Sequence, residues 1–162
     1  MKRTQGPPAS SLRERLSHGG PVRIAVHGFS LLPAIPPGAR LEVVPAGPAG
    51  PGAGDLVVVE IGGMPVCHLL ASAPSPDAPW ITRGLWAAAP DPPVPPEALL
   101  AVVSHLDAIG LRIPVTGRPF RAWLAACRAA APAIRLARQL AWPLVPVSLR
   151  RRLRRGLDRE RT

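Results

Sequence analysis

Proline and glycine interrupt the chain at short intervals as far as Pro119, and this spacing disfavours long helices before that residue. The 162 residues include 23 Pro and 15 Gly. Pro lacks the backbone N–H that helices and central strands use, and Gly has no side chain to restrict its backbone. A fold of short strands and turns therefore fits the sequence better than a helix bundle does.

Six segments before Pro119 have the pattern of β-strands. They either alternate apolar and polar residues or consist largely of β-branched and other apolar residues. They are residues 22–26, 39–44, 56–61, 64–70, 80–83 and 99–106. We therefore predict a mainly β domain over residues 21–115. The preceding residues 1–20 are predicted to form a flexible polar arm with at most one or two helical turns, which Gly19 and Gly20 end.

After Pro119 the apolar period becomes helical. One stripe is predicted, with Arg121, Arg128 and Arg135 along its flank. Its members are Phe120, Trp123, Leu124, Cys127, Ala131 and Ile134. This spacing is typical of an amphipathic helix, and Pro132 is expected to kink it. Residues 116–162 are therefore predicted to form a basic helical tail.

The chain has a formal net charge of +10, and its charged residues are distributed unevenly along the sequence. Residues 21–110 contain three Arg and seven acidic residues, whereas residues 111–162 contain thirteen Arg and two acidic residues. Such a segment attracts phosphates of lipids or nucleic acids, and the apolar stripe beside it favours the membrane surface. We expect peripheral contact with an anionic membrane and no nucleic-acid partner; the alternative is that the apolar stripe packs on the β domain. The Arg residues concerned are Arg121, Arg128, Arg150, Arg151, Arg152, Arg154 and Arg155.

Neither a metal site nor a membrane span is predicted. Cys67 and Cys127 lie sixty residues apart without the Cys/His spacing of a zinc site, so we expect free, reduced, buried thiols and no cofactor. The first residues lack the apolar core of a signal peptide, and Pro143 and Pro146 break the apolar run of residues 141–147. We expect a cytoplasmic protein that is at most peripheral at the membrane.

Ser30 lies on a predicted turn that could expose a nucleophile. Gly28 permits close backbone approach two residues before it, and Pro33 directs the chain away from the strand three residues after it. Alone, this arrangement is also that of an ordinary turn serine.

Later segments follow Ser30 in an informative order. They are Gly54-Asp55 with an apolar strand, Val66-Cys67-His68, Ile81-Thr82-Arg83-Gly84 and Asp91. Together with the Gly-x-Ser-x-x-Pro pattern of residues 28–33, this order resembles the signal peptidase I family. That family belongs to the wider superfamily of signal peptidase and LexA-like serine peptidases. The likeness covers residues 22–106 and is closer to the Ser-His branch found in archaea and the endoplasmic reticulum.

The resemblance implies a coiled β-sheet peptidase domain with a Ser-His-Asp site. Ser30 would be the nucleophile, His68 the general base and Asp91 the acid that orients His68. Gly28 and Leu31 would support the loop whose backbone N–H groups hold the oxyanion. The substrate implied is an extended peptide with small residues near the cleaved bond.

The histidine branch also agrees with the composition. Lys2 is the only lysine, and it lies in the arm, so a Ser-Lys pair has no available partner. A base must then be one of four histidines, and imidazole titrates near neutral pH. His68 occupies the family position, His27 and His105 are expected to be structural, and His18 lies in the arm.

Three departures from the family pattern keep an alternative open. Leu31 replaces the usual Met, Leu69 the usual Arg, and Leu85 the first of two usual acids. The chain could therefore be a catalytically inactive peptidase fold that serves as a binding module, with a basic tail that docks on a membrane or nucleic acid. A third hypothesis, a LexA-like regulator that cleaves itself, would need a DNA-binding domain before the peptidase body, and twenty residues are too few for one.

Overall fold

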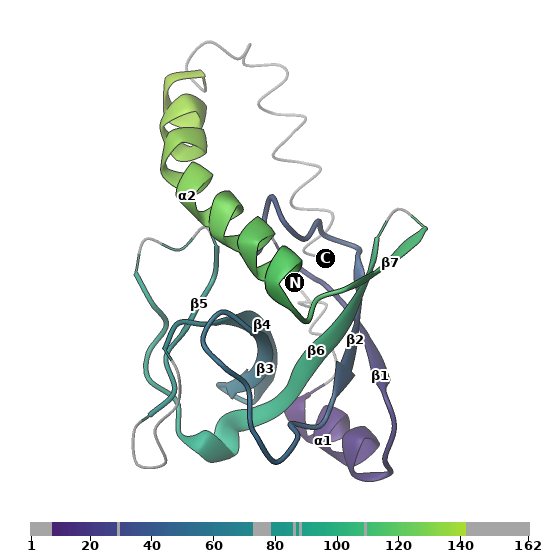
Figure 1. Ribbon diagram of the computed structural model, residues 1–162. Helices are drawn as coiled ribbons and strands as arrows, with labels where there is room; N and C mark the ends of the chain where they lie inside the picture. Colours follow the sequence, from purple (N-terminus) through teal and green to yellow (C-terminus); the bar gives the residue numbers. More distant parts are fainter. Residues whose placement is uncertain are drawn as a thin grey trace, which may run out of the picture.

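The computed structural model describes residues 8–28, 30–72, 79–85, 87, 89–108 and 110–141, with only the backbone described at 135 and 137–141. In this part the chain is mainly β with a long C-terminal helix, as predicted (Figure 1). The elements are α1 (Ala9–Ser17), β1 (Val22–Ala25), β2 (Arg40–Val44), β3 (Leu56–Ile61), β4 (Met64–Leu70), β5 (Thr82–Arg83), a 3₁₀ turn (Pro96–Ala98), β6 (Leu99–Ala108), β7 (Leu111–Pro114) and α2 (Arg118–Ala141).

The strands form one antiparallel sheet in the order β1-β2-β6-β3-β4-β5. The ten-residue strand β6 is its centre, since β2 lies along one edge and β3 and then β7 lie along the other. Register shifts at Glu42/Val43 and Val58/Val59 interrupt the pairing of β6 with these neighbours. Bulges of this kind increase local twist, which suits the strong curl of the sheet in Figure 1.

The prediction of a flexible arm over residues 1–20 is wrong for the part that the structure describes. Residues 9–17 form the helix α1, whose Ala9, Leu12 and Leu16 are buried in the main core. These positions follow the i, i+3, i+7 spacing of one helix face. Arg13 adds a hydrogen bond to the Glu97 carbonyl and an ion pair with Glu60. The helix is therefore part of the body, and residues 1–7 lie outside the description.

Removal of the Leu12 side chain should destabilise the protein substantially. Leu12 is among the most deeply buried side chains, so Leu12→Ala is expected to lower the free energy of unfolding by about 2–5 kcal/mol. The control is Ser10→Ala, at an exposed position of the same helix. Urea unfolding of both variants measures the effect, and equal midpoints would show that α1 does not contribute to the core.

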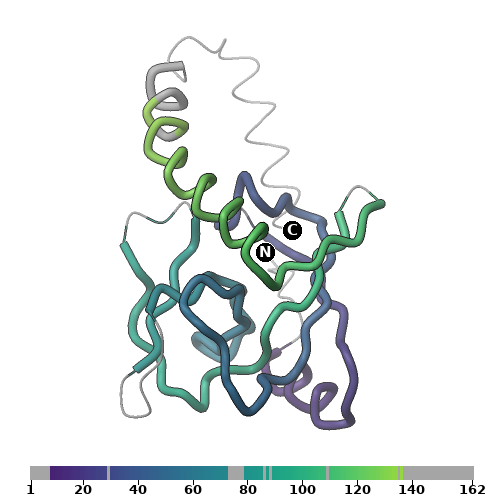
Figure 2. The backbone as a smooth tube through the Cα atoms, viewed as in Figure 1, coloured from purple at the N-terminus to yellow at the C-terminus, as the bar shows by residue number. Residues whose placement is uncertain are grey.

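The predicted apolar stripe of α2 divides into a buried and an exposed part. Phe120, Leu124, Cys127 and Ala131 are buried, which places the first turns of the helix against the body. In contrast, Trp123 and Ile134 are 51% and 38% exposed. The coloured part of α2 in Figure 2 already extends beyond the sheet, and the helix runs through Pro132 to Ala141. Within the described residues, no helix is both long and apolar enough to cross a bilayer.

An ion pair fixes the first part of α2 to the sheet. Arg121 donates to Asp55 Oδ1 from Nε and Nη2 at 3.0 and 2.6 Å. The other carboxylate oxygen of Asp55 accepts the Gly52 N–H at 2.8 Å, in the turn before β3. Asp55 therefore has the turn role expected of a Gly-Asp pair and also contacts the helix. The predicted membrane contacts Arg150, Arg151, Arg152, Arg154 and Arg155 lie outside the described residues.

Candidate active site

Ser30 lies at the surface in a loop whose two ends are fastened together. Val26 N–H donates to Ala39 O at 2.8 Å, and Gly38 N–H donates to Val26 O at 3.0 Å. These bonds extend the pairing of β1 with β2 and close the base of the loop. Ser30 is exposed, so its hydroxyl lies at the surface of an otherwise anchored segment.

The residues around Ser30 explain how the loop is held. Leu31 and Ile35 are buried in the main core, and Ile35 N–H donates to Leu31 O at 3.0 Å. Gly28 has φ +119°, a backbone conformation that side-chain-bearing residues rarely adopt. The chain thus bends at Gly28 and is anchored by Leu31, immediately after the candidate nucleophile. The oxyanion role predicted for this loop remains a prediction.

His68 lies on β4, between β3 and β5. It pairs with Val57 on one side, and the next residue, Leu69, pairs with Arg83 on the other. Because side chains alternate along a strand, Leu69 faces the opposite side from His68. Leu69 is buried in the core, so the position where the family carries Arg has a packing role here. The His68 side chain itself is 12% exposed.

Asp91 reaches His68 from the loop that follows β5. Two backbone hydrogen bonds between Trp80 and Val94 close this loop, and Asp91 N–H donates to Thr82 O at 2.8 Å. Asp91 Oδ2 then lies 2.6 Å from His68 Nδ1. A carboxylate oxygen can only accept, so this contact assigns a proton to Nδ1, and in the neutral imidazole Nε2 then keeps its lone pair. This is the tautomer that a general base for Ser30 requires.

Gly84 marks the point where Ser30 and His68 approach each other. A Cβ atom on Gly84 would lie 3.1 Å from Ser30 Cβ and 3.3 Å from His68 Nε2. The distance between Ser30 Cβ and His68 Nε2 therefore cannot exceed the sum of these two distances. No hydrogen bond joins the Ser30 hydroxyl to Nε2 between these two described side chains; such bonds are often long before substrate binds. Ser30, His68 and Asp91, from three separate segments, therefore form one group.

Leu85 lies in the main core and not at this group. It is 3% exposed. An acid at this position would be costly to bury, whereas Leu contributes apolar packing. Among the described residues, the acid that contacts His68 is Asp91. Leu at position 85 therefore leaves the His-Asp contact intact.

No hydrogen bond or ion pair joins the other three histidines, all described, to this group. His18 Nδ1 contacts the Glu14 carbonyl at 2.8 Å at the end of α1, and His27 is exposed. His105 is on β6, where its Nδ1 lies 3.2 Å from Glu42 Oε1. Cys67 and Cys127 are free, and burial raises the pKa of the Cys67 thiol to about 12. Burial also raises the pKa of Cys127, so both thiols are held in the protonated form and not as nucleophilic thiolates.

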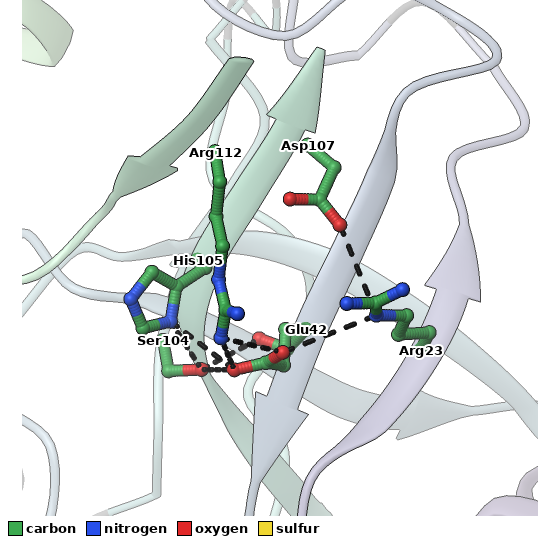
Figure 3. A network of polar contacts seen from close by, with 6 residues as sticks. All are labelled: Arg23, Glu42, Ser104, His105, Asp107 and Arg112. Atoms are coloured by element: carbon green, nitrogen blue, oxygen red, sulfur yellow. Dashed lines mark hydrogen bonds and ion pairs between the residues drawn. The ribbon is translucent and has the colours of Figure 1, made fainter. Parts of the chain in front are cut away.

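Sequence reasoning missed a second polar cluster, centred on the buried carboxylate of Glu42. Figure 3 shows this carboxylate between the guanidinium groups of Arg112 and Arg23. Arg112 donates to its two oxygens at 2.7 and 2.9 Å, and Ser104 to Oε1 at 3.3 Å. Arg23 also lies 3.8 Å from Asp107. The cluster joins β1, β2, β6 and β7, so it fastens the sheet end that carries the Ser30 loop.

The stability of the protein should depend on the ionisation of Glu42. Burial raises the pKa of Glu42, but Arg112, His105 and the Ser104 hydroxyl lower it more, so it lies below the ordinary 4.5. A lowered folded-state pKa gives stability that is present above the unfolded-state pKa and is lost as pH falls through the folded-state pKa. Glu42→Gln should therefore be less stable than wild type at pH 7, and the difference should narrow below pH 4.5.

Urea unfolding at a series of pH values measures this difference. The control is Glu60→Gln, because the Glu60–Arg13 ion pair is exposed and such pairs contribute little. If the difference in unfolding free energy between wild type and Glu42→Gln stays constant at acid pH, the carboxylate charge is not its cause.

No protein-family model matches the chain, and the searches of curated proteins and of solved structures find no match either. Any assignment of function therefore depends on the chemistry of the residues above.

Proposed function

We propose that the chain is a serine endopeptidase with a signal-peptidase-like coiled β-sheet domain. The observation that carries the proposal is the contact of His68 Nδ1 with Asp91 Oδ2 at 2.6 Å, with Nε2 close to the Ser30 side chain. This order of acid, imidazole and hydroxyl is the one that nucleophilic serine catalysis requires. The family resemblance supports the same roles for the same three residues.

The reaction proceeds through an acyl-enzyme. Ser30 Oγ attacks the peptide carbonyl carbon while His68 Nε2 accepts its proton, and Asp91 stabilises the imidazolium that forms. Backbone N–H groups in the segment from Gly28 to Leu31 hold the oxyanion. His68 then gives the proton to the leaving amine as the C–N bond breaks. Water, deprotonated by His68, attacks the acyl carbonyl, and Ser30 regains its proton.

The substrate implied by the family resemblance is an extended peptide with small residues beside the cleaved bond. A leader or signal segment of another protein has this character, as does a peptide that is processed after synthesis. Turnover should be sought with such peptides in the cytoplasm or at the membrane surface.

A fluorophosphonate probe tests the proposal without a known substrate, because it reacts covalently with activated serines. Mass spectrometry of the full chain should show one added probe in wild type and none in Ser30→Ala. Ser17→Ala is the matched control, since the Ser17 hydroxyl is exposed on α1 and donates to Glu14 O. A folded wild-type chain that stays unlabelled would reject an activated Ser30.

That result would instead support the inactive binding module. The observation in its favour is that Leu69 and Leu85 replace the family's Arg and first acid, and both side chains pack in the core. The two hypotheses differ in whether Ser30 is activated, so the same labelling experiment separates them.

We also propose that α2 contacts an anionic membrane. Trp123, Ile134 and Leu136 are 51%, 38% and 57% exposed, and Arg128 has no ion pair within the described residues. An amphipathic helix at a lipid surface uses such apolar residues together with basic ones. Arg121 already binds Asp55, so Arg128 is the better described candidate for lipid phosphate.

Vesicle sedimentation measures this contact. The full chain should sediment more with anionic than with neutral vesicles, and Trp123→Ser and Arg128→Gln should each weaken the anionic binding. Both positions are exposed, so these variants spare the buried face of α2. Equal sedimentation with the two kinds of vesicle would leave α2 as a packing element alone.

A further inference from the structure

Thr82 holds Asp91 at two points. Its carbonyl accepts the Asp91 N–H at 2.8 Å, and its hydroxyl donates to Asp91 Oδ2 at 2.7 Å. Thr82 is fully buried, and Thr82 and Glu42 are the polar or charged residues buried in the described part of the chain. A buried hydroxyl needs a partner, and here that partner is the acid beside His68.

Strand β5 gives Thr82 a fixed position relative to His68. Thr82 pairs with Leu70 on β4, two residues beyond His68, and Arg83 pairs with Leu69. The sheet thus sets the distance between the strand carrying the base and the strand carrying the threonine. Asp91 comes from a loop, and among the described residues the hydrogen bonds that join its backbone and side chain to β5 are both made by Thr82.

The same oxygen, Asp91 Oδ2, accepts from both Thr82 Oγ1 and His68 Nδ1. Two donors on one oxygen restrict rotation of the carboxylate about its last bond. If the Thr82 hydroxyl were absent, Oδ2 could turn away from Nδ1, and the imidazole would lose the partner that keeps its proton on Nδ1. The neutral ring could then place its proton on Nε2, where it would block proton transfer from Ser30.

We propose that Thr82 is a positioning residue that orients Asp91 and thereby selects the catalytic tautomer of His68. This inference rests on the proposed function, because the tautomer matters for catalysis only if Ser30 is a nucleophile. Thr82 does not contact the reacting atoms itself. It acts through Asp91, as a partner of a catalytic acid.

The matched pair of variants is Thr82→Val and Thr82→Ser. Val keeps the shape of the buried side chain without the hydroxyl, and Ser keeps the hydroxyl without the methyl group. With a fluorophosphonate probe, Thr82→Val should lower the limiting labelling rate roughly 10- to 100-fold at unchanged probe affinity, the scale of one hydrogen bond to a charged group. Thr82→Ser should retain most of the wild-type rate.

Nitrogen-15 NMR of the full chain gives a readout that does not depend on activity. The His68 ring signals, assigned by comparison with His68→Gln, should show the Nδ1–H tautomer in wild type and in Thr82→Ser. They should show a mixture of tautomers in Thr82→Val. The far-downfield proton signal of the short hydrogen bond between His68 Nδ1 and Asp91 Oδ2 should also be lost in Thr82→Val.

The outcomes separate the two proposals. An unlabelled wild type whose His68 tautomer still changes in Thr82→Val would reject the peptidase and support the positioning role. A labelled wild type whose tautomer and rate are unchanged in Thr82→Val would overturn the positioning role and leave the peptidase. Equal losses in Thr82→Val and Thr82→Ser would also overturn it, because Thr82→Ser keeps the hydroxyl, so the loss would follow any change of this buried side chain and not removal of the hydroxyl.

Discussion

Asp91→Asn is expected to lower the rate of Ser30 acylation about 10⁴-fold, the scale of removing the acid from a Ser-His-Asp group, while the chain stays folded. The reason lies in the atom that contacts the base, since Asp91 Oδ2 accepts from His68 Nδ1 at 2.6 Å. If the Asn amide nitrogen takes this place, it donates to Nδ1 and forces the ring proton onto Nε2. If the amide oxygen takes it, the negative charge that stabilises the imidazolium is lost.

Labelling kinetics with a fluorophosphonate probe measure this effect, and Asp55→Asn is the matched control. The side chains of Asp91 and Asp55 are both 17% exposed, and both bind a basic side chain, His68 and Arg121 respectively. Asp55→Asn removes a carboxylate of similar burial that lies outside the Ser30, His68 and Asp91 group. This variant should therefore be labelled at the wild-type rate. Equal labelling of Asp91→Asn and wild type would show that His68 acts without the acid.

Much of the sheet could be predicted because most strands carry a clear local pattern. The β-branched run of residues 56–61 and the hairpin return of 64–70 match β3 and β4. The short β7 was missed because its four residues are all exposed, so it has no alternation of buried and exposed positions to detect. The packing of α1 was missed for a different reason. Its three buried positions lie among polar residues, and their partners come from distant strands.

The candidate site was predictable where the order of motifs carried information. Ser30, His68 and Asp91 were proposed from that order, and the fold places them together. The roles of Thr82 and Gly84 could not be predicted, because each depends on an atom-to-atom contact between segments.

Glu42 was missed since a Glu within an alternating strand looks like an exposed position. Only the tertiary fold brings Arg112 across from β7 to meet it.

The absence of a side chain at Gly84 is what lets Ser30 and His68 approach. A Cβ there would lie 3.1 Å from both Ser30 Cβ and Ser30 O, and 3.3 Å from His68 Nε2. These separations are closer than ordinary contacts between such atoms, which begin near 3.5 Å. The φ angle of Gly84 is not in the positive range that excludes other residues. An Ala could thus adopt this backbone conformation, and its methyl group would act only by pushing the nucleophile and the base apart.

Gly84→Ala should therefore reduce labelling of Ser30, by at most about 10²-fold, because the added methyl group must displace Ser30 or His68 by a few tenths of an ångström and a full ångström has an effect of that order. Gly47→Ala is the matched control, since Gly47 also lacks a positive φ and a Cβ there would meet nothing within 4 Å. Both variants should unfold near the wild-type temperature if the added methyl group acts only on its immediate neighbours. Wild-type labelling by Gly84→Ala, with its fold intact, would mean that Ser30 and His68 do not react across this point, and the serine peptidase assignment would lose its geometric basis.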